Sequence, residues 1–366
     1  GRLGRLAATA APAASGGSLC VAGEALVDFL PTRAADGDAA YRWRPGGSPF
    51  NVCVGAARLG VPVSFLGTLS TDMFGVALRE ALARERVDLG AVRSADRPTT
   101  LAFVGEPRPG AADVPYAFFA ENAADRAVTA EMAAQALADR SYGAAHASLG
   151  AVTLEDAAMA SFFQEFFGTA RARGAVACFD PNVRRPMIRG GFESYRARVE
   201  RFVGLVDIAK ASDEDVRALY GDHIELASIA GEWLDRGARL VLLTRGAQGA
   251  TAFFRAPGGA QAAVSSAPPC AQPDTIDAGG NAAPVADTVG AGDAFTAAFL
   301  GGLLGADGGG GCLARQALGE RPWDAAAEAR LGELMHRAVV SSAIACSRPG
   351  ADPPTASEVA AALTAT

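Results

Sequence analysis

A glycine-rich turn that ends in an acidic residue is the part of this sequence whose residue types and spacing point most directly to chemistry. Asp287–Leu304 reads D-T-V-G-A-G-D-A-F-T-A-A-F-L-G-G-L-L, and the apolar run after the second aspartate predicts a helix that begins at the turn. The first N–H groups of a helix lack intrahelical partners and lie at the positive end of the helix dipole. The turn therefore predicts an anion site. Its residues are Gly290, Ala291 and Gly292.

Asp293 directly follows this turn and could accept the proton of a hydroxyl group bound there. A phosphate-binding turn with a base beside it favours phosphoryl transfer to an alcohol. The alternative is a strand-to-helix turn whose aspartate only caps the helix. These residues alone favour the two interpretations equally.

A second motif near the N-terminus carries groups suited to sugar hydroxyls. Pro45–Gly60 reads P-G-G-S-P-F-N-V-C-V-G-A-A-R-L-G. Gly46 and Gly47 allow a ligand to approach the backbone closely, and the proline after them fits the first turn of a helix. Asn51 lies on that turn and can both donate to and accept from a hydroxyl. The alternative is a tight turn followed by a capping polar residue.

Composition and charge narrow the classes of protein. The chain has 366 residues, of which 50% are hydrophobic and 20% charged, as expected for a globular protein with a large core. The net charge of −7 and the absence of a basic run argue against a nucleic-acid partner. No apolar stretch approaches the roughly 18 residues of a membrane span, so no membrane partner is expected. Lys210 is the single lysine, which favours a specific role for it.

The six cysteines are scattered without a C-x-x-C pair. This spacing predicts buried thiols in a reducing cytoplasm, and neither a disulfide framework nor a zinc site. Residues 1–17 are rich in alanine and contain no acidic residue. We interpret them as a flexible leader, with a targeting peptide as the alternative.

Apolar runs that alternate with amphipathic stretches predict parallel strands joined by right-handed helical crossovers. The predicted strands are Leu19–Ala25, Val63–Leu69, Ala144–Leu149, Val176–Phe179, Val206–Ala209 and Leu240–Thr244, followed by an antiparallel edge strand at Thr251–Arg255. Ligands of such sheets bind at the carboxyl ends of the strands. Asp28 follows the first strand and is expected to contact the ligand. Glu24 fits either a ligand contact or a solvated loop.

Further β-rich runs lie outside this alternation. Pro98–Val104 and Pro115–Phe119 are separated by a segment of proline and glycine, and Tyr41–Arg44 reads as an exposed or edge strand. They predict either a small separate sheet or a hairpin at the edge of the main sheet.

The two motifs together, G-G-S-P-x-N-x-x-x-x-x-x-R-L-G near the N-terminus and D-T-V-G-A-G-D-A-F near the C-terminus, closely resemble the ribokinase (PfkB-type) family of carbohydrate kinases. Their order and separation also match that family. Gly23–Pro31, and Arg44-Pro45 ahead of the glycine pair, look most like the fructokinase branch. The resemblance implies one ribokinase-like α/β domain over residues 18–366, with a doubly wound, mainly parallel sheet flanked by helices. It also implies a small β-sheet lid from about residues 27–45 and 98–120.

The resemblance implies transfer of the γ-phosphoryl group of ATP to a sugar hydroxyl, with D-fructose to fructose 6-phosphate as the expected reaction. Asp293 would accept the hydroxyl proton, and the amides of Gly290–Asp293 would hold the charge that develops on the phosphoryl group. The residues that would bind the sugar, or face the sugar and the transferring phosphate, are Asp28, Gly46, Gly47, Asn51, Asn182 and Arg184.

Two strand ends and the loop around Asp287 would bind ATP and the cations. Thr244, Gly246 and Gly249 form a T-x-G-x-x-G that resembles the family's nucleotide-phosphate loop, and Lys210 and Ser212 are assigned to the same ligand. The family usually has Asn-x-x-Glu where this chain has Ser212-x-x-Asp215, so Asp215 would act on Mg²⁺ through water. The alternative is the acidic first turn of a helix. The backbone around Asp287 and the turn Ser347–Ala351 would hold K⁺.

The family also implies a homodimer through the lid, for which the aromatic residues Phe103, Tyr116, Phe118 and Phe119 would supply a face or form the lid's own core. The alternatives for the function are a 2-keto-3-deoxygluconate kinase or another PfkB-type sugar kinase, a nucleoside kinase, and a non-catalytic sugar or nucleotide sensor. A dinucleotide-dependent oxidoreductase is the weakest, because no G-x-G-x-x-G follows the first strand. Residues 267–286 form an insertion to which we assign no function.

Overall fold

A nine-stranded sheet forms the centre of the structure. The structure is a computed structural model, and it describes residues 17–105, 116–148, 155–188, 190–269, 275–305 and 312–365. In order across the sheet, its strands are β13 (Gln261–Ser266), β12 (Ala250–Arg255), β11 (Leu240–Thr244), β10 (Ile208–Ser212), β9 (Val176–Asp180), β8 (Ala144–Ser148), β1 (Leu19–Ala22), β4 (Val63–Ser70) and β5 (Val92–Ala95). The pairs from β11 to β5 are parallel. The predicted mainly parallel sheet is therefore confirmed.

The antiparallel strands at one side of the sheet correct one prediction. β12 is antiparallel to β11, as expected for residues 251–255, but it is not an edge strand. β13 pairs with it over six residues and forms the edge instead. Every second residue of β13 is exposed, and such a short, half-polar strand lacks the continuous apolar run of the buried strands.

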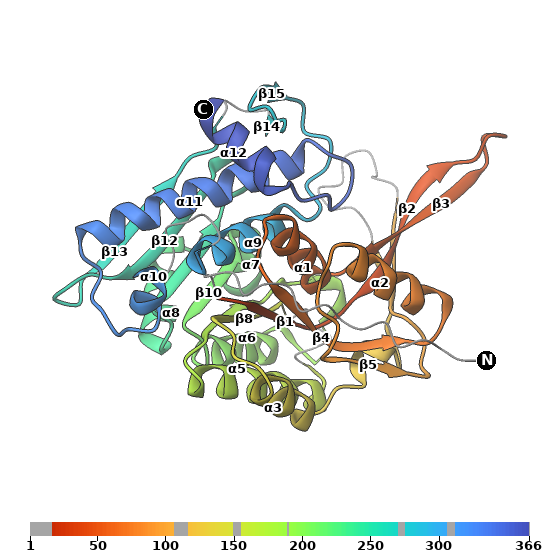
Figure 1. The fold of residues 1–366 in the computed structure, drawn as a ribbon, viewed down its shortest axis with the longest axis horizontal. Coiled ribbons are helices and arrows are strands. Elements are labelled where there is room, and N and C mark those ends of the chain that lie inside the picture. Colours follow the sequence, from red (N-terminus) through yellow and green to blue (C-terminus); the bar gives the residue numbers. More distant parts are fainter. Residues whose placement is uncertain are drawn as a thin grey trace.

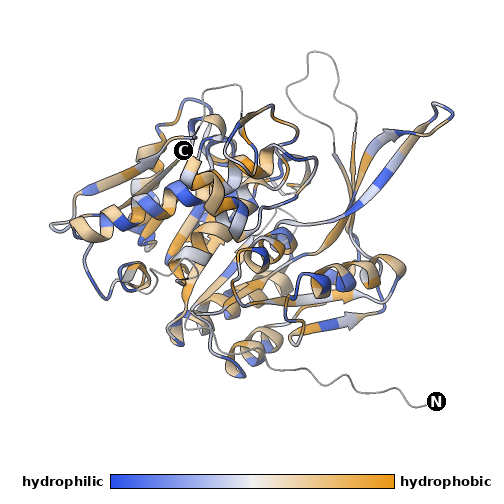
Figure 2. Ribbon diagram, turned by 45° about the horizontal axis from the view of Figure 1, so that its top comes forward, coloured by the Kyte–Doolittle hydropathy of each residue, from blue (hydrophilic) through white to orange (hydrophobic). Residues whose placement is uncertain are grey.

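Helices cover both faces of the sheet, as a doubly wound fold requires (Figure 1). One core cluster lies between the sheet and the helices α1 (Ser48–Arg58), α2 (Met73–Arg84), α9 (Ala291–Leu303), α10 (Cys312–Ala317), α11 (Ala325–Cys346) and α12 (Ala356–Ala365). The other lies beneath α3 (Ala130–Ala138), α5 (Ala157–Ala172), α6 (Phe192–Val203), α7 (Asp213–Tyr220) and α8 (Leu226–Arg236). Figure 2 shows hydrophobic residues along the central sheet and the helix faces against it, with hydrophilic residues on the outer faces.

The packing of α9 places the glycine-rich turn. This helix is buried along nearly its whole length, between α1 on one side and α11 on the other. A Cβ atom added to Gly55 of α1 would lie 2.9 Å from Cβ of Ala297, so only glycine allows the two helices to approach this closely. Close packing of α1 and α9 brings their first turns together at one end of the sheet.

A second sheet of four strands projects from the body, and its longest hairpin forms the arm in Figure 1. Its order is β3 (Ala39–Gly46), β2 (Leu26–Arg33), β6 (Leu101–Val104) and β7 (Tyr116–Phe119). These strands come from the segments 27–45 and 98–120 that the family resemblance assigned to a lid, and residues 106–115 lie outside the described chain. We call this sheet the lid sheet.

Three remaining predictions concern the N-terminal leader, the insertion at residues 267–286 and membrane-spanning helices. Of the expected leader, residues 1–16 lie outside the described chain, and the N–H of Gly17 donates to the Leu304 carbonyl at 3.3 Å. The described part of the insertion at residues 267–286 contains a short hairpin. Its two strands, β14 (Thr275–Ile276) and β15 (Ala282–Ala283), have two residues each. The hydroxyl of Thr275 donates to the Ala343 carbonyl at 2.6 Å, which holds this hairpin on α11. No helix in the described residues combines the length and apolarity of a membrane span.

Candidate active site

Asp293 lies where the first turns of α1 and α9 meet. Its Oδ1 atom accepts a hydrogen bond from Oγ of Ser48 at 2.5 Å, and its Oδ2 atom accepts one from Nδ2 of Asn51 at 2.8 Å. The N-cap of α9 is Gly290, and no side chain caps the helix. The interpretation of Asp293 as a mere helix cap is therefore wrong. The structure brings together the two motifs, which are more than 240 residues apart in the chain.

The surroundings of Asp293 adjust its affinity for a proton. Burial raises the pKa of its carboxyl group, while the hydrogen bonds from Ser48 and Asn51 and the charge of Lys210 act in the opposite direction. A buried carboxylate with a raised pKa is a better proton acceptor than an exposed one. The site therefore holds a candidate base in a fixed orientation.

The turn before Asp293 has the local geometry on which the predicted anion site depends. Gly290 adopts a left-handed conformation with φ of 78°, and a Cβ atom there would lie 2.7 Å from Cβ of Ala351. The first intrahelical hydrogen bond runs from the N–H of Ala294 to the Gly290 carbonyl. The N–H groups of Gly292 and Asp293 precede that bond and lie at the positive end of α9.

Lys210 reaches the same turn from the sheet. A Cβ atom on Gly292 would lie 3.0 Å from Nζ of Lys210, so the ammonium group lies directly beside the start of α9. Nζ donates to Oδ2 of Asp180 at 2.7 Å, and both side chains are 6% exposed. Burial disfavours the charged lysine, but the carboxylate more than offsets it, and the pKa of Lys210 is raised. Lys210 was predicted to serve the ligand, whereas its partner Asp180 was missed, because a lone aspartate at a strand end carries no signal of its own.

The lid sheet contributes Asp28 beside the glycine pair. A Cβ atom on Gly46 would overlap Oδ2 of Asp28, and Gly47 has a φ of 99°. Burial raises the pKa of Asp28 to about 6, with Arg184 lowering it and Asp293 raising it further. These effects indicate that Asp28, Asp293 and Arg184 lie near one another.

Asn182 and Arg184 follow β9 at the same end of the sheet. Asn182 has a left-handed backbone with φ of 41°, and its N–H donates to Oδ1 of Asp180 at 3.0 Å. The Arg184 guanidinium is exposed and donates to the carbonyl of Val183 at 3.1 Å. Its charge acts on the carboxyl groups of Asp28 and Glu24. The turn thus supplies a cation at the mouth of the cleft.

Ser212 and Asp215 form a capping box at the start of α7. Oδ2 of Asp215 accepts from the N–H and Oγ of Ser212, and its Oδ1 accepts from the N–H of Val183 at 2.8 Å. The acidic-first-turn interpretation therefore describes the local structure, and the role of Asp215 toward Mg²⁺ stays a prediction. Within the described chain, no group of three or more His, Cys, Asp or Glu side chains could hold a metal ion.

The predicted nucleotide-phosphate loop follows β11, next to Ser212. Thr244 pairs with Ser212 across the sheet, and a 3₁₀ turn, η3 (Gly246–Gln248), begins two residues later. Gly249 has a φ of 80°, and a Cβ atom there would overlap the Ser266 carbonyl. The loop thus lies at the carboxyl ends of the strands, in line with the other candidate residues.

The side chain of Asp287 links the loop before α9 to the turn after α11 by hydrogen bonds. Its Oδ1 accepts from the N–H of Val289 at 3.0 Å, and its Oδ2 accepts from the N–H of Gly350 at 2.9 Å. The carbonyl of Cys346 accepts from the N–H groups of Ala286 and Asp287. The closing turn is therefore fastened to the start of the glycine-rich motif.

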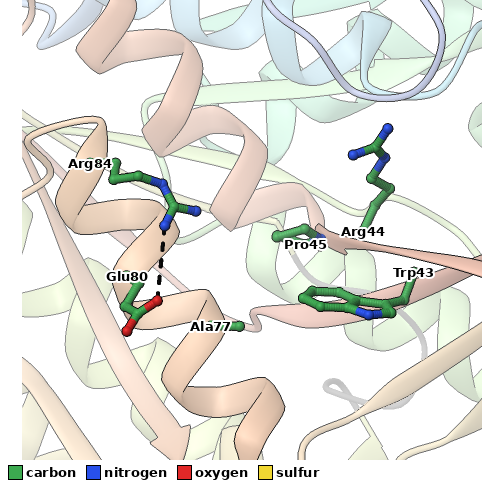
Figure 3. Close-up of a pocket in the computed structure, with 6 residues that line it drawn as sticks. All are labelled: Trp43, Arg44, Pro45, Ala77, Glu80 and Arg84. Carbon is green, nitrogen blue, oxygen red and sulfur yellow. Dashed lines mark ion pairs between the residues drawn. The ribbon is translucent and has the colours of Figure 1, made fainter.

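A separate pocket of about 360 Å³ lies at the root of the lid sheet, between β3 and α2. Figure 3 shows that Trp43 and Arg44 project to opposite sides of β3 there, and that Glu80 and Arg84 pair on α2. Its lining residues are Trp43, Arg44, Pro45, Ala77, Glu80 and Arg84. None of the residues predicted for the site lines this pocket, so it is distinct from the cleft around Asp293.

Comparison with known proteins is consistent with this geometry. The model of the family described as pfkB family carbohydrate kinase matches residues 17–357. A fructokinase of Rhizobium leguminosarum bv. trifolii is 32% identical over 283 residues, covering 77% of this chain and 78% of that protein. A fructokinase of Klebsiella pneumoniae is 31% identical over 290 residues, covering 78% and 84%. A crystal structure of fructokinase with bound ATP from Xylella fastidiosa superposes with a TM-score of 0.77 at 26% identity, covering 95% and 98%.

Proposed function

The chain belongs to the pfkB family of carbohydrate kinases, and we propose that it transfers the γ-phosphoryl group of ATP to D-fructose, giving fructose 6-phosphate. The observation that carries this proposal is the pair of hydrogen bonds that holds Asp293 beside the open N-terminus of α9. The substrate follows from two relatives above 30% identity that are named fructokinases.

Asp293 accepts the proton of the attacking hydroxyl while the oxygen bonds to the γ-phosphorus. The N–H groups at the start of α9 and the ammonium of Lys210 face the negative charge that develops on the transferring group. Phosphoryl transfer asks for little covalent help from the protein, so fixed positions and fixed charges supply most of the rate enhancement.

The sugar lies between the lid sheet and the body. Asp28 accepts from its hydroxyls, Asn51 and Asn182 orient it, and the glycines at 46 and 47 leave room for it against the backbone. Arg184 stands at the mouth, where it would meet the sugar and the transferring phosphate. Closing the lid sheet over this cleft would exclude water, which competes with the sugar for the phosphoryl group.

ATP approaches from the side of Thr244, Gly246 and Gly249. Mg²⁺ bound to the phosphates neutralises part of their charge. Asp215 fits a water-mediated contact to it, because both of its oxygens are already engaged by Ser212 and Val183 and the site offers no cage of carboxylates in the described residues. Ser212 orients that carboxylate.

K⁺ is proposed to lie between the loop at Asp287 and the closing turn at 347–351. Two hydrogen-bonded loops that face one another can offer several backbone carbonyls to one ion, which suits a large monovalent cation. We also propose a cytoplasmic location, because Cys20, Cys53, Cys178 and Cys346 are free thiols.

A homodimer through the lid sheet is supported by one aromatic face of that sheet. Phe29 and Phe103 stack with ring centroids 4.4 Å apart, and Tyr41 and Phe119 contact Phe103 edge-on. Phe119 is 62% exposed and Tyr41 51%. Tyr116 and Phe118 lie on the opposite face, with Asp28, so the four predicted aromatics divide between the two faces. Phe119→Ser should shift the molecular mass in light scattering from dimer to monomer.

The test of the proposed function is ADP release with Mg-ATP and K⁺ for fructose, ribose, 2-keto-3-deoxygluconate and adenosine. A kcat/KM for fructose at least about tenfold above the others supports the proposal. A higher value for another acceptor keeps the kinase and changes its substrate. If the protein binds ATP but phosphorylates none of these acceptors, a non-catalytic sensor becomes the favoured interpretation in place of a kinase.

A further inference from the structure

Glu24 occupies the place in this sheet where a ligand is expected. It lies in the connection between β1 and β2, at the carboxyl end of β1. β1 pairs with β4 on one side and with β8 on the other, and the chain leaves β1 toward β4 and returns later to β8. Open α/β sheets bind their ligands in the crevice at such a reversal of strand order.

One oxygen of the Glu24 carboxyl group lacks a partner, while the group also accepts a backbone hydrogen bond. Its Oε2 atom is buried and has no hydrogen-bond partner, and it is the one acidic oxygen of this kind in the described chain. Three other carboxylates nearby are paired: Asp293 with Ser48 and Asn51, Asp180 with Lys210, and Asp125 with Thr100 at 2.6 Å. Buried polar atoms in folded proteins are nearly always satisfied, so this one indicates a missing ligand.

The position of Glu24 is held by backbone packing. A Cβ atom on Gly47 would lie 3.0 Å from the Glu24 carbonyl oxygen, so residue 24 lies against the glycine pair that faces the sugar. The charged groups that act on its carboxyl are Asp125 before α3, Arg184 after β9 and Asp293 of α9. Two of these groups, Arg184 and Asp293, are candidate site residues.

We propose that Glu24 is a sugar-positioning residue that, as a neutral carboxylic acid, donates a hydrogen bond to an oxygen atom of the bound sugar. The proposal rests on the sugar kinase function given above. A neutral carboxyl has one O–H donor, whereas Asp28 and Asp293 as carboxylates can only accept. Sugar hydroxyls need partners of both kinds, and the amide of Asn51 already donates to Asp293.

The charge balance of the cleft explains why this group is neutral. Burial, with smaller contributions from the negative charges of Asp125 and Asp293, raises the pKa of Glu24 to about 8, against the opposing effects of a backbone hydrogen bond and of Arg184. Below that pH Glu24 carries the proton it would donate. Above it the proton is lost, and a further negative charge appears beside Asp293 and the incoming phosphates.

The test compares Glu24→Gln, Glu24→Ala and the parent enzyme, with Glu232→Gln on the exposed face of α8 as the matched control. Glutamine keeps the shape and a donor, so its KM for the sugar at pH 7 should stay within about threefold of the parent value. Alanine should raise that KM by about tenfold or more, with kcat and the KM for ATP nearly unchanged.

The pH profile separates this role from a structural one. The KM of the parent enzyme for the sugar should rise above about pH 8, by up to tenfold per pH unit, whereas that of Glu24→Gln should stay level. A sugar KM unaffected by Glu24→Ala, or an equal alkaline rise in Glu24→Gln, would overturn the proposal. If Glu24→Ala does not fold, the pH dependence of the sugar KM of Glu24→Gln decides whether the proposal holds.

Failure of the proposed function would be recognised separately. The assays use whichever acceptor the parent enzyme phosphorylates, so a substrate other than fructose leaves the test of Glu24 intact. If no acceptor is phosphorylated, titration calorimetry of fructose with the parent protein and Glu24→Ala replaces KM. Equal binding to both, or none to the parent, would overturn the role of Glu24.

Discussion

The side-chain amide of Asn51 donates to Oδ2 of Asp293 across 2.8 Å, which joins the first turn of one helix to the first turn of another. Ser48, on the same turn of α1, holds the other oxygen of the carboxylate. The orientation of the proposed base is thus set by the motif that also carries Gly46 and Gly47, the glycines proposed to face the sugar. Under the proposed function, the contact between α1 and α9 would position both the substrate and the base.

Asp293→Asn should lower kcat by on the order of 10²–10⁴ while ATP binding persists. The amide keeps the shape of the side chain and can still bond to α1, but it cannot accept the hydroxyl proton. Steady-state rates with titration calorimetry of ATP measure both quantities. A variant that retains nearly the full rate would remove Asp293 from the mechanism.

Ser48→Ala should move the acid limb of the kcat profile to higher pH. The hydrogen bond from Ser48 favours the charged form of Asp293 and so lowers its pKa, against the effect of burial. Without this bond the pKa rises, and the base is already protonated at a pH where the parent enzyme still works. Rates from pH 5 to 9 test this, and an unchanged profile would show that the bond does not influence the base.

Lys210→Met should destabilise the fold by about 3–5 kcal/mol, because it leaves the carboxylate of Asp180 buried without its cation. Asp180→Asn should cost a similar amount by leaving Lys210 unpaired. The double variant should lose less free energy of unfolding than the two single variants combined, since neither buried charge remains. Urea unfolding of the four proteins measures the coupling, and strictly additive losses would contradict a buried ion pair.

Replacing K⁺ by a large organic cation should lower kcat/KM by about tenfold, because the loops at the start of α9 would lose the ion between them. Asp287→Ala should remove most of this dependence, since Gly350 would lose its acceptor and the closing turn its attachment. Equal rates with and without K⁺ in the parent enzyme would rule out the cation.

Much of the fold was accessible from the residues themselves. The runs at 19–22 and 240–244 are almost entirely apolar, and the run at 63–70, which also holds Ser, Thr and Gly, is buried throughout, as expected for strands covered on both faces. β13 was missed because its composition is that of a loop, Q-A-A-V-S-S, and its pairing with β12 alone makes it a strand.

The site could be predicted in its motifs but not in its pairings. Asp293 and Lys210 stand out because of a glycine-rich turn and a unique residue type. Their partners, Ser48 and Asp180, are ordinary residues whose importance comes from which strands and helices become neighbours. The unpaired carboxyl of Glu24 likewise appears only when the packing shows that nothing satisfies it.

The wedging of α9 between α1 and α11 has a consequence for the order of events during synthesis. Ser48 and Asn51 leave the ribosome more than 240 residues before their partner Asp293, and the closing turn that bonds to Asp287 comes later still. A nascent chain that has completed β1, the lid sheet and α1 therefore carries Gly46 and Gly47 before residue 293 has been made. Under the proposed function, phosphoryl transfer becomes possible only once residues 287–350 have been added, so a ribosome stalled earlier would display a partial site that cannot consume ATP.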